Sequence, residues 1–215
     1  MQRLRVRFCR GQEIKFISHL DIVRLWQRTF HRVGIPLVYS KGFNPHPQIS
    51  LAAPLPVGLT SEAELMDVIT SRMISPHWFT AVVSQQLPLG VQILQVYPMG
   101  LSQPSLQSLV RYAEYKVEVA SEKDKDDVES ALVSLLSLEH LPWQHKRDTG
   151  QRHYDLRALI DKLWLVDWSH HCCTLGMRLR CDNSGSGRAE QVVAALGFIQ
   201  YPELIHRTML ILKTN

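Results

Sequence analysis

The order of strand-like and helix-like segments constrains the fold of this chain most. In residues 3–8, apolar side chains alternate with arginines, and this period of two predicts a strand with one apolar face. Ser18 with Asp21 then resembles a capping box and predicts a helix that ends near Gly34. The later elements are expected over residues 48–53 (extended), 62–70 (strand), 75–87 (helix) and 91–97 (strand). The predicted order is β-α-β-β-α-β.

The second half of the chain predicts the same order with one extra strand. Ser121 with Asp124 is expected to cap a helix that carries an apolar stripe. Strands are expected over residues 111–119, 142–145, 155–166, 173–181 and 205–212, with a short helix over 188–196. We therefore predict an α+β protein of two tandem ferredoxin-like (βαββαβ) domains with antiparallel sheets. Their expected boundaries are residues 1–100 and 106–215.

Composition excludes several broad classes of protein. With 215 residues, of which 45% are hydrophobic, the chain has a globular rather than a disordered composition. Its longest uncharged stretch, residues 73–110, is interrupted by prolines and polar residues, so it cannot supply the roughly 20 apolar residues of a membrane span. The N-terminus also lacks the apolar core of a signal peptide. We expect a cytoplasmic protein with no membrane association.

Positive charge is concentrated in the first half. Residues 1–100 hold ten Lys and Arg against five acidic residues. On a strand, Arg3, Arg5 and Arg7 would project from one sheet face about 6–7 Å apart, close to the spacing of phosphates along an extended nucleic-acid strand. The pattern predicts an open, phosphate-binding sheet face. The alternative is that these arginines pair with neighbouring carboxylates.

A stiff polar loop follows the first helix. Gly42 and two prolines restrict the loop, which carries Lys41, Phe43, Asn44 and His46. Binding loops commonly combine a charge, an aromatic ring, an amide and an imidazole. The alternative is a structural loop with Phe43 in the core. A second basic turn, at Lys146 and Arg147, is expected either to contact phosphates or to be an ordinary surface turn.

Catalytic and metal-binding motifs are weak. The sequence has no nucleophile-elbow, zincin or iron–sulfur pattern, and the four cysteines lack C-x-x-C spacing. We expect reduced, buried cysteines, no metal and no cofactor. His19, Lys41 and His46 are the candidate catalytic residues.

Several segments carry a specific resemblance. The most distinctive are Phe-Ile-Ser-His-Leu-Asp at 16–21 and Tyr-Ser-Lys-Gly-Phe-Asn-Pro-His-Pro-Gln-Ile-Ser at 39–50. Two more, Pro-Leu-Pro-Val-Gly at 54–58 and Ser-Glu-Ala-Glu at 61–64, include Gly58. Weaker matches cover residues 113–117, 155–160 and 183–188. Together these segments are similar to the uncharacterised bacterial family called the radical-SAM-linked proteins.

This resemblance implies partners rather than an activity. Members are often encoded beside, or fused after, a cobalamin-binding radical S-adenosylmethionine (radical SAM) protein, and neighbouring genes often encode ribosomal proteins and a ribonuclease. It implies a separately encoded radical SAM partner here, and it marks Ser18, Asp21, Gly42 and Gly58 as motif positions. The turn after Lys146 and Arg147 has fewer lysines than is usual in the family, which weakens phosphate binding there.

Three functional hypotheses follow. The first is an RNA-binding accessory domain that delivers structured RNA, such as ribosomal or transfer RNA, to a radical SAM enzyme or RNA-processing machinery. The second is a metal-independent endoribonuclease with His19 or His46 as general base and Lys41 stabilising the phosphate. The third is a small-molecule-binding enzyme with a pocket between residues 18–21 and 43–46. We also predict that His19 or Asp21 contacts Asn44 or His46 in one site.

Overall fold

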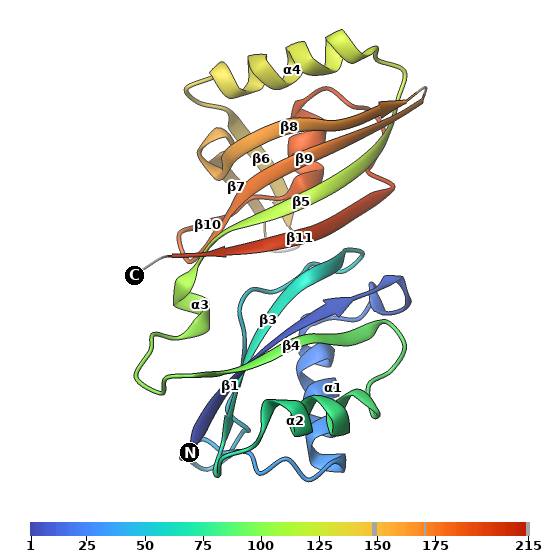
Figure 1. Cartoon of the computed structure of the whole chain (residues 1–215). Helices are drawn as coiled ribbons and strands as arrows, with labels where there is room; N and C mark the ends of the chain where they lie inside the picture. Colours follow the sequence, from blue (N-terminus) through green and yellow to red (C-terminus); the bar gives the residue numbers. More distant parts are fainter. Residues whose placement is uncertain (148–149, 170, 214–215) are drawn as a thin grey trace. The chain divides into compact units, whose positions relative to one another are not determined.

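The structure is a computed structural model that describes residues 1–147, 150–169 and 171–213, without the side chains of residues 145–147 and 152. It is a mixed α+β fold with mostly antiparallel sheet, which confirms the predicted class (Figure 1). The chain divides into two compact units. Unit 1 contains residues 1–110 and the few residues from Leu212 onward, and unit 2 contains residues 111–211. Among the described residues, no helix is long and apolar enough to cross a membrane.

Unit 1 has the predicted element order. Its strand β1 pairs antiparallel with β3 on one side and β4 on the other, and β2 pairs antiparallel with β3, so the strand order is β2-β3-β1-β4. The bounds are β1 (Gln2–Arg10), η1 (Gln12–Ile14), α1 (His19–Arg32), β2 (Ile49–Leu51), β3 (Thr60–Thr70), α2 (Pro76–Ser84), β4 (Val91–Met99) and α3 (Leu106–Leu109).

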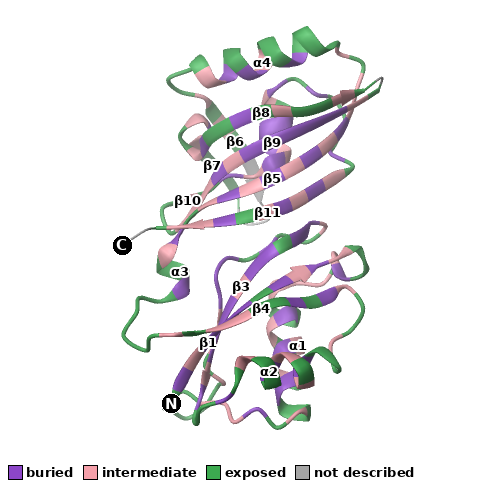
Figure 2. Ribbon diagram, viewed as in Figure 1, coloured by how far each residue is buried: buried purple, intermediate pink, exposed green. Residues whose placement is uncertain are grey.

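Strand register sorts the side chains of this sheet between two faces. On one face, Val6 lies opposite Met66 and Val96, and these side chains belong to or pack against the core beneath α1 and α2. Figure 2 shows that buried residues recur along β1 and β3. Aromatic rings from both helices fill that core: the ring centroids of Trp26 and Phe30 lie 5.4 Å apart, and those of Phe30 and Phe79 lie 5.5 Å apart. The other face carries one row across all four strands, made of Ser50, Asp67, Arg5 and Tyr97.

Unit 2 repeats the order with additional strands. In it, β9 pairs antiparallel with β5 on one side and with β8 and β10 on the other, and β11 neighbours β5. The bounds are β5 (Val110–Ser121), α4 (Lys125–Ser137), β6 (Pro142–Arg147), β7 (Gly150–Asp155), η2 (Arg157–Leu159), β8 (Ile160–Ser169), β9 (His171–Asp182), β10 (Gly185–Ser186), α5 (Ala189–Ala195) and β11 (Leu204–Leu212).

Two sequence expectations in unit 2 are wrong. Strands β6 and β7 form a separate two-stranded sheet, and the strand of the main sheet begins only at Ile160. Asp155 produces this break, because one carboxylate oxygen accepts the N–H groups of Leu141 (2.9 Å) and Arg157 (3.0 Å). Helix α4 also starts later than expected: Asp124 is its N-cap, whereas Ser121 is the last residue of β5.

Candidate nucleic-acid interface

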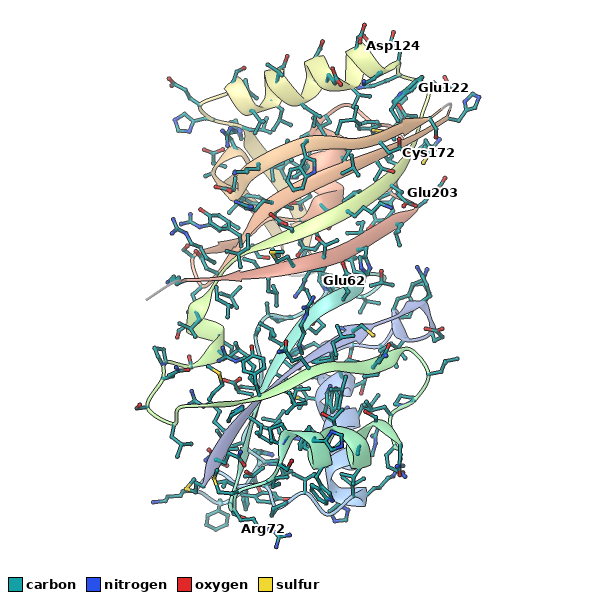
Figure 3. The ribbon with its side chains drawn as sticks, in the orientation of Figure 1. Glu62, Arg72, Glu122, Asp124, Cys172 and Glu203 are labelled. Atoms are coloured by element: carbon teal, nitrogen blue, oxygen red, sulfur yellow. The ribbon has the colours of Figure 1, made fainter. Side chains whose placement is uncertain are left out.

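One end of unit 1 gathers the loop that the sequence analysis singled out. Residues 31–48 and 71–78, here called the loop pole, lie where β3 ends and β1 begins. The N–H of Val38 donates to Ile69 O (2.9 Å), and the N–H of Ser71 donates to Pro36 O (2.8 Å). Arg72, labelled in Figure 3, marks this end of the unit. The fold therefore brings two separate segments of the chain to one surface.

The loop itself is fixed by its own backbone. Tyr39 and Pro47 form a bridge, the N–H of Ser40 donates to His46 O (2.8 Å), and the N–H of His46 donates to Ser40 Oγ (3.0 Å). Gly42 has a φ of +141°, a region that favours glycine. Phe43, at the tip, is fully exposed, so the alternative that it lies in the core is wrong. Lys41, Asn44 and His46 are exposed beside it.

The loop pole has a net positive charge, because it contains no acidic residue. The sequence contains no Asp or Glu over residues 22–61 or 68–113, and both segments of the pole lie within these ranges. Its exposed cations are Arg32, Lys41 and Arg72, accompanied by the exposed histidines His31, His46 and His77. Exposed apolar side chains accompany them: Tyr39, Met73 and Trp78. Cations interleaved with exposed rings are the surface that single-stranded nucleic acids bind.

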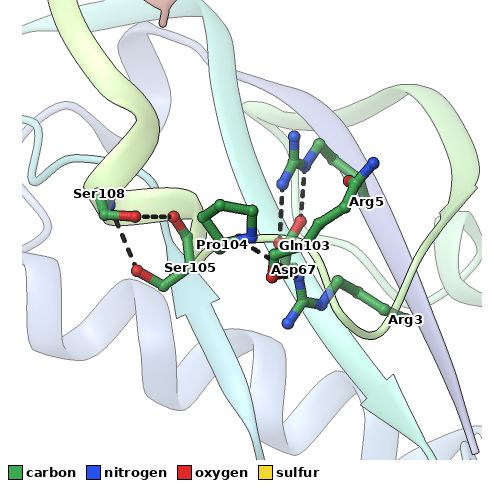
Figure 4. A network of polar contacts seen from close by, with 7 residues as sticks. All are labelled: Arg3, Arg5, Asp67, Gln103, Pro104, Ser105 and Ser108. Carbon is green, nitrogen blue, oxygen red and sulfur yellow. Dashed lines mark hydrogen bonds and ion pairs between the residues drawn. The ribbon is translucent and has the colours of Figure 1, made fainter. Parts of the chain in front are cut away.

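The predicted row of three exposed arginines is wrong at its centre. Arg5 is buried, and its guanidinium is bidentate to Asp67, with Nε 2.7 Å from Oδ1 and Nη2 2.9 Å from Oδ2 (Figure 4). Burial alone would lower the pKa of Arg5, but the hydrogen bond to Asp67 and its charge raise it. Arg3 donates to the carbonyl oxygens of Gln103 (2.9 Å) and Pro104 (3.3 Å). Arg7 is exposed, as expected. Asp67 lies directly opposite Arg5, which only the strand register reveals.

His19 and Asp21 do not join the loop in one site. His19 begins α1 at the far end of β1, near Arg10, whereas the loop pole lies at the Gln2 end. The eight residue steps of β1 separate these ends by about 26 Å. The predicted contact with Asn44 or His46 is therefore wrong, and so is the small-molecule pocket between these segments. The physical reason is that α1 carries the chain the length of the sheet before the loop begins.

The environment of His19 is electrostatically distinct. Burial, followed by the positive charge of Arg10, lowers the pKa of His19, and the negative charge of Glu64 acts in the opposite direction. Ser18 caps α1, accepting from Asp21 N (3.3 Å) and donating to Asp21 Oδ2 (2.7 Å). Gly58 has a φ of +91° and donates its N–H to Lys15 O (2.7 Å). These motif positions build the end of unit 1 opposite the loop pole.

Other sequence candidates lie in unit 2. Lys146 and Arg147 belong to β6, but their side chains lie outside the described part of the structure. None of the cysteines forms a disulfide, and only Cys173 is buried, which raises the pKa of its thiol to about 11. The expected burial of the other three is wrong, because each is partly exposed. Within the described residues, no group of three or more potential metal ligands occurs.

Comparison with known proteins places the chain in a family. The model of a family described as uncharacterised proteins conserved in bacteria (DUF2344) matches residues 3–189. The chain belongs to this family. No curated protein matches it.

Solved structures share the fold of this family member at low identity. A chain in a crystal structure of a Cbf5–Nop10–Gar1 complex is 8% identical, with a TM-score of 0.55, and the match covers 96% of this chain and 48% of that one. A chain in the structure of an H/ACA RNP bound to a substrate RNA containing 2′-deoxyuridine is also 8% identical, with a TM-score of 0.51. That match covers 95% of this chain and 46% of the other. This chain thus spans about half the length of the chains it matches.

The sequence analysis missed part of the loop pole. Arg72 and Met73 lie more than twenty residues beyond the loop and are brought to it by β3. One sequence signal could have found them: the absence of acidic residues from two separate segments, each containing exposed cations.

Proposed function

We propose that this protein binds RNA through the loop pole, as an accessory to a separately encoded radical SAM protein or to RNA-processing machinery. The observation that carries the proposal is the full exposure of Phe43 on a loop whose backbone is fixed. The loop pole around it contains cations and no acidic residue. The resemblance to the radical-SAM-linked proteins supports the choice of partner.

The chemistry of the loop pole suits a single strand. An exposed ring that stacks on a base contributes about 1–3 kcal/mol per base, largely independent of sequence. Lys41, Arg32 and Arg72 supply the positive charge that neutralises phosphates. Because the loop is already fixed, little conformational freedom is lost on binding. Arg5 does not belong to the proposed phosphate contacts, because Asp67 neutralises its charge.

The comparisons support the proposal at the level of fold. One matched chain comes from a particle bound to a substrate RNA, and the other from a Cbf5–Nop10–Gar1 complex. We also infer that both units are ferredoxin-like, because β2-β3-β1-β4 and β8-β9-β5-β11 give equivalent strand orders around equivalent element orders.

A matched pair of variants tests the proposal. Binding of a fluorescent ten-nucleotide single-stranded RNA is measured by anisotropy at about 50 mM salt, where phosphate contacts are strong. We expect Lys41→Ala/Phe43→Ala to weaken binding at least about tenfold. Lys15→Ala/Phe16→Ala is the control, because it removes another lysine beside an exposed phenylalanine, at the opposite end of the unit.

Two results would overturn the proposal: no binding by the unmodified protein, or equal losses in the two variants. The same incubation with a chelator tests the endoribonuclease alternative, which retains Lys41 and His46 in one loop. Cleavage that disappears in His46→Ala would favour that alternative over simple binding.

A further inference from the structure

A cavity lies on the face of the unit 1 sheet that carries Arg5 and Asp67. It has a volume of about 200 Å³, and its polar lining includes Arg3, Gln48, Ser50 and Asp67. Ile69 and Leu106 contribute apolar lining. The cavity adjoins the loop pole along the chain, since Gln48 is the pole's last residue and its N–H donates to Val38 O (2.8 Å) at the base of the loop.

Hydrogen-bonding capacity around this cavity is unfilled. The Nε of Arg3 is buried without a partner. Within the described structure, the side chains of Gln48 and Ser50 make no hydrogen bond. Both oxygens of Asp67 accept from Arg5, but a carboxylate oxygen has two lone pairs, so acceptor capacity remains. A buried polar atom such as Arg3 Nε is normally paired, and a ligand in the cavity is one way to pair it.

Two of the polar groups, those of Arg3 and Asp67, are also held in place before any ligand arrives. Ser50 lies directly opposite Asp67, and Arg5 fixes the Asp67 carboxylate from the other side. The carbonyl groups of Gln103 and Pro104 hold the guanidinium of Arg3 (Figure 4). The lining therefore presents one donor group, the Arg3 guanidinium, and one acceptor group, the Asp67 carboxylate, in fixed positions.

We propose that this cavity takes one unpaired nucleobase of the RNA strand bound at the loop pole, an inference that rests on the proposed function. A base has apolar faces and an edge of mixed donors and acceptors, which match Ile69 and Leu106 on one hand and Arg3, Gln48, Ser50 and Asp67 on the other. A phosphate fits less well, because it would meet the Asp67 carboxylate and apolar walls. Unpaired bases are read in this way, on their edges and in pockets.

The test uses base selectivity, which phosphate contacts do not alter. Four oligomers of about ten positions each carry one ribonucleotide, A, C, G or U, with abasic residues elsewhere, so that their phosphate charge is equal. We expect the unmodified full-length protein to prefer one base over the weakest by about tenfold. In Gln48→Ala/Ser50→Ala the preference should fall to about twofold or less, while the salt dependence of binding stays the same.

The control variant is Ser84→Ala/Gln85→Ala, which changes the same residue types at the exposed end of α2. Because neither Gln48 nor Ser50 has a side-chain partner, we expect their replacement to leave the thermal unfolding midpoint unchanged. RNA binding with no base preference, or a preference unaltered in Gln48→Ala/Ser50→Ala, would overturn the cavity proposal and leave the proposed function standing. Absence of all RNA binding would overturn both.

Discussion

At the scale of single residues, the Arg5–Asp67 pair changes the character of a whole sheet face. The side chains are 3% and 4% exposed, so both charges are withdrawn from water. A bidentate geometry offsets much of the desolvation cost. The pair supplies a positioned carboxylate on this sheet face instead of a free cation.

Breaking this pair from one side should destabilise the protein strongly. We expect Asp67→Asn to lower the free energy of unfolding by about 3–5 kcal/mol, because it leaves a buried guanidinium without its counter-charge. The double variant Arg5→Met/Asp67→Leu removes both charges, so its free energy of unfolding should fall by less than that of Asp67→Asn. Urea unfolding followed by circular dichroism measures both values, and a double variant less stable than Asp67→Asn would contradict the buried-pair interpretation.

His19 should make stability depend on pH. Its pKa is lower in the folded protein than the ordinary value of 6.5, so the unfolded chain binds more protons. The contribution of neutral His19 to the free energy of unfolding is fully present above pH 6.5, and it is lost as the pH falls toward the pKa of His19 in the folded protein. His19→Gln should therefore flatten the loss of unfolding free energy as the pH falls below 6.5. An NMR titration that places the pKa of His19 above 6.5 would refute this.

At the scale of elements, the N-cap of α1 makes a measurable contribution to the stability of the folded protein. Ser18 satisfies the N–H of Asp21 in the first turn. Ser18→Ala should lower the free energy of unfolding by about 1 kcal/mol, and Ser18→Asp should retain most of it, since Asp is also a good N-cap. Ser84→Ala, at the exposed end of α2, is the matched control. Equal losses at positions 18 and 84 would show that the cap contributes nothing.

Helices and strands were predictable where the side-chain periodicity was strong. The strand with which each predicted strand pairs was not predictable. Alternation in residues 3–8 identified β1, and Ser18 identified the start of α1. The same reasoning predicted strands over residues 142–145 and 155–166, but a strand pattern does not show which strand each one pairs with. The hairpin β6–β7 pairs with itself instead.

At the scale of the whole molecule, the uneven charge distribution predicts how RNA binding responds to salt. If the three exposed cations of the loop pole each neutralise a phosphate of a single strand, log Kd should rise with log salt with a slope of about 2. Lys41→Ala should reduce the slope by about 0.7, and Lys15→Ala should leave it unchanged. Anisotropy titrations across a series of salt concentrations measure this, and equal slopes in all three proteins would contradict a role for Lys41.

By itself, the sequence determined the α+β class, the element order of unit 1 and the composition of the polar loop, because these depend on periodicity, capping and turn residues close together in the chain. Tertiary structure decided which side chains meet. Strand register placed Asp67 against Arg5 and Ser50 against Asp67. The direction of α1 separated His19 from His46, and the length of β3 brought Arg72 beside the loop. A shift of one residue in register moves every side chain of a strand to the opposite face, so residues distant in sequence share a site only through pairing that local patterns do not encode.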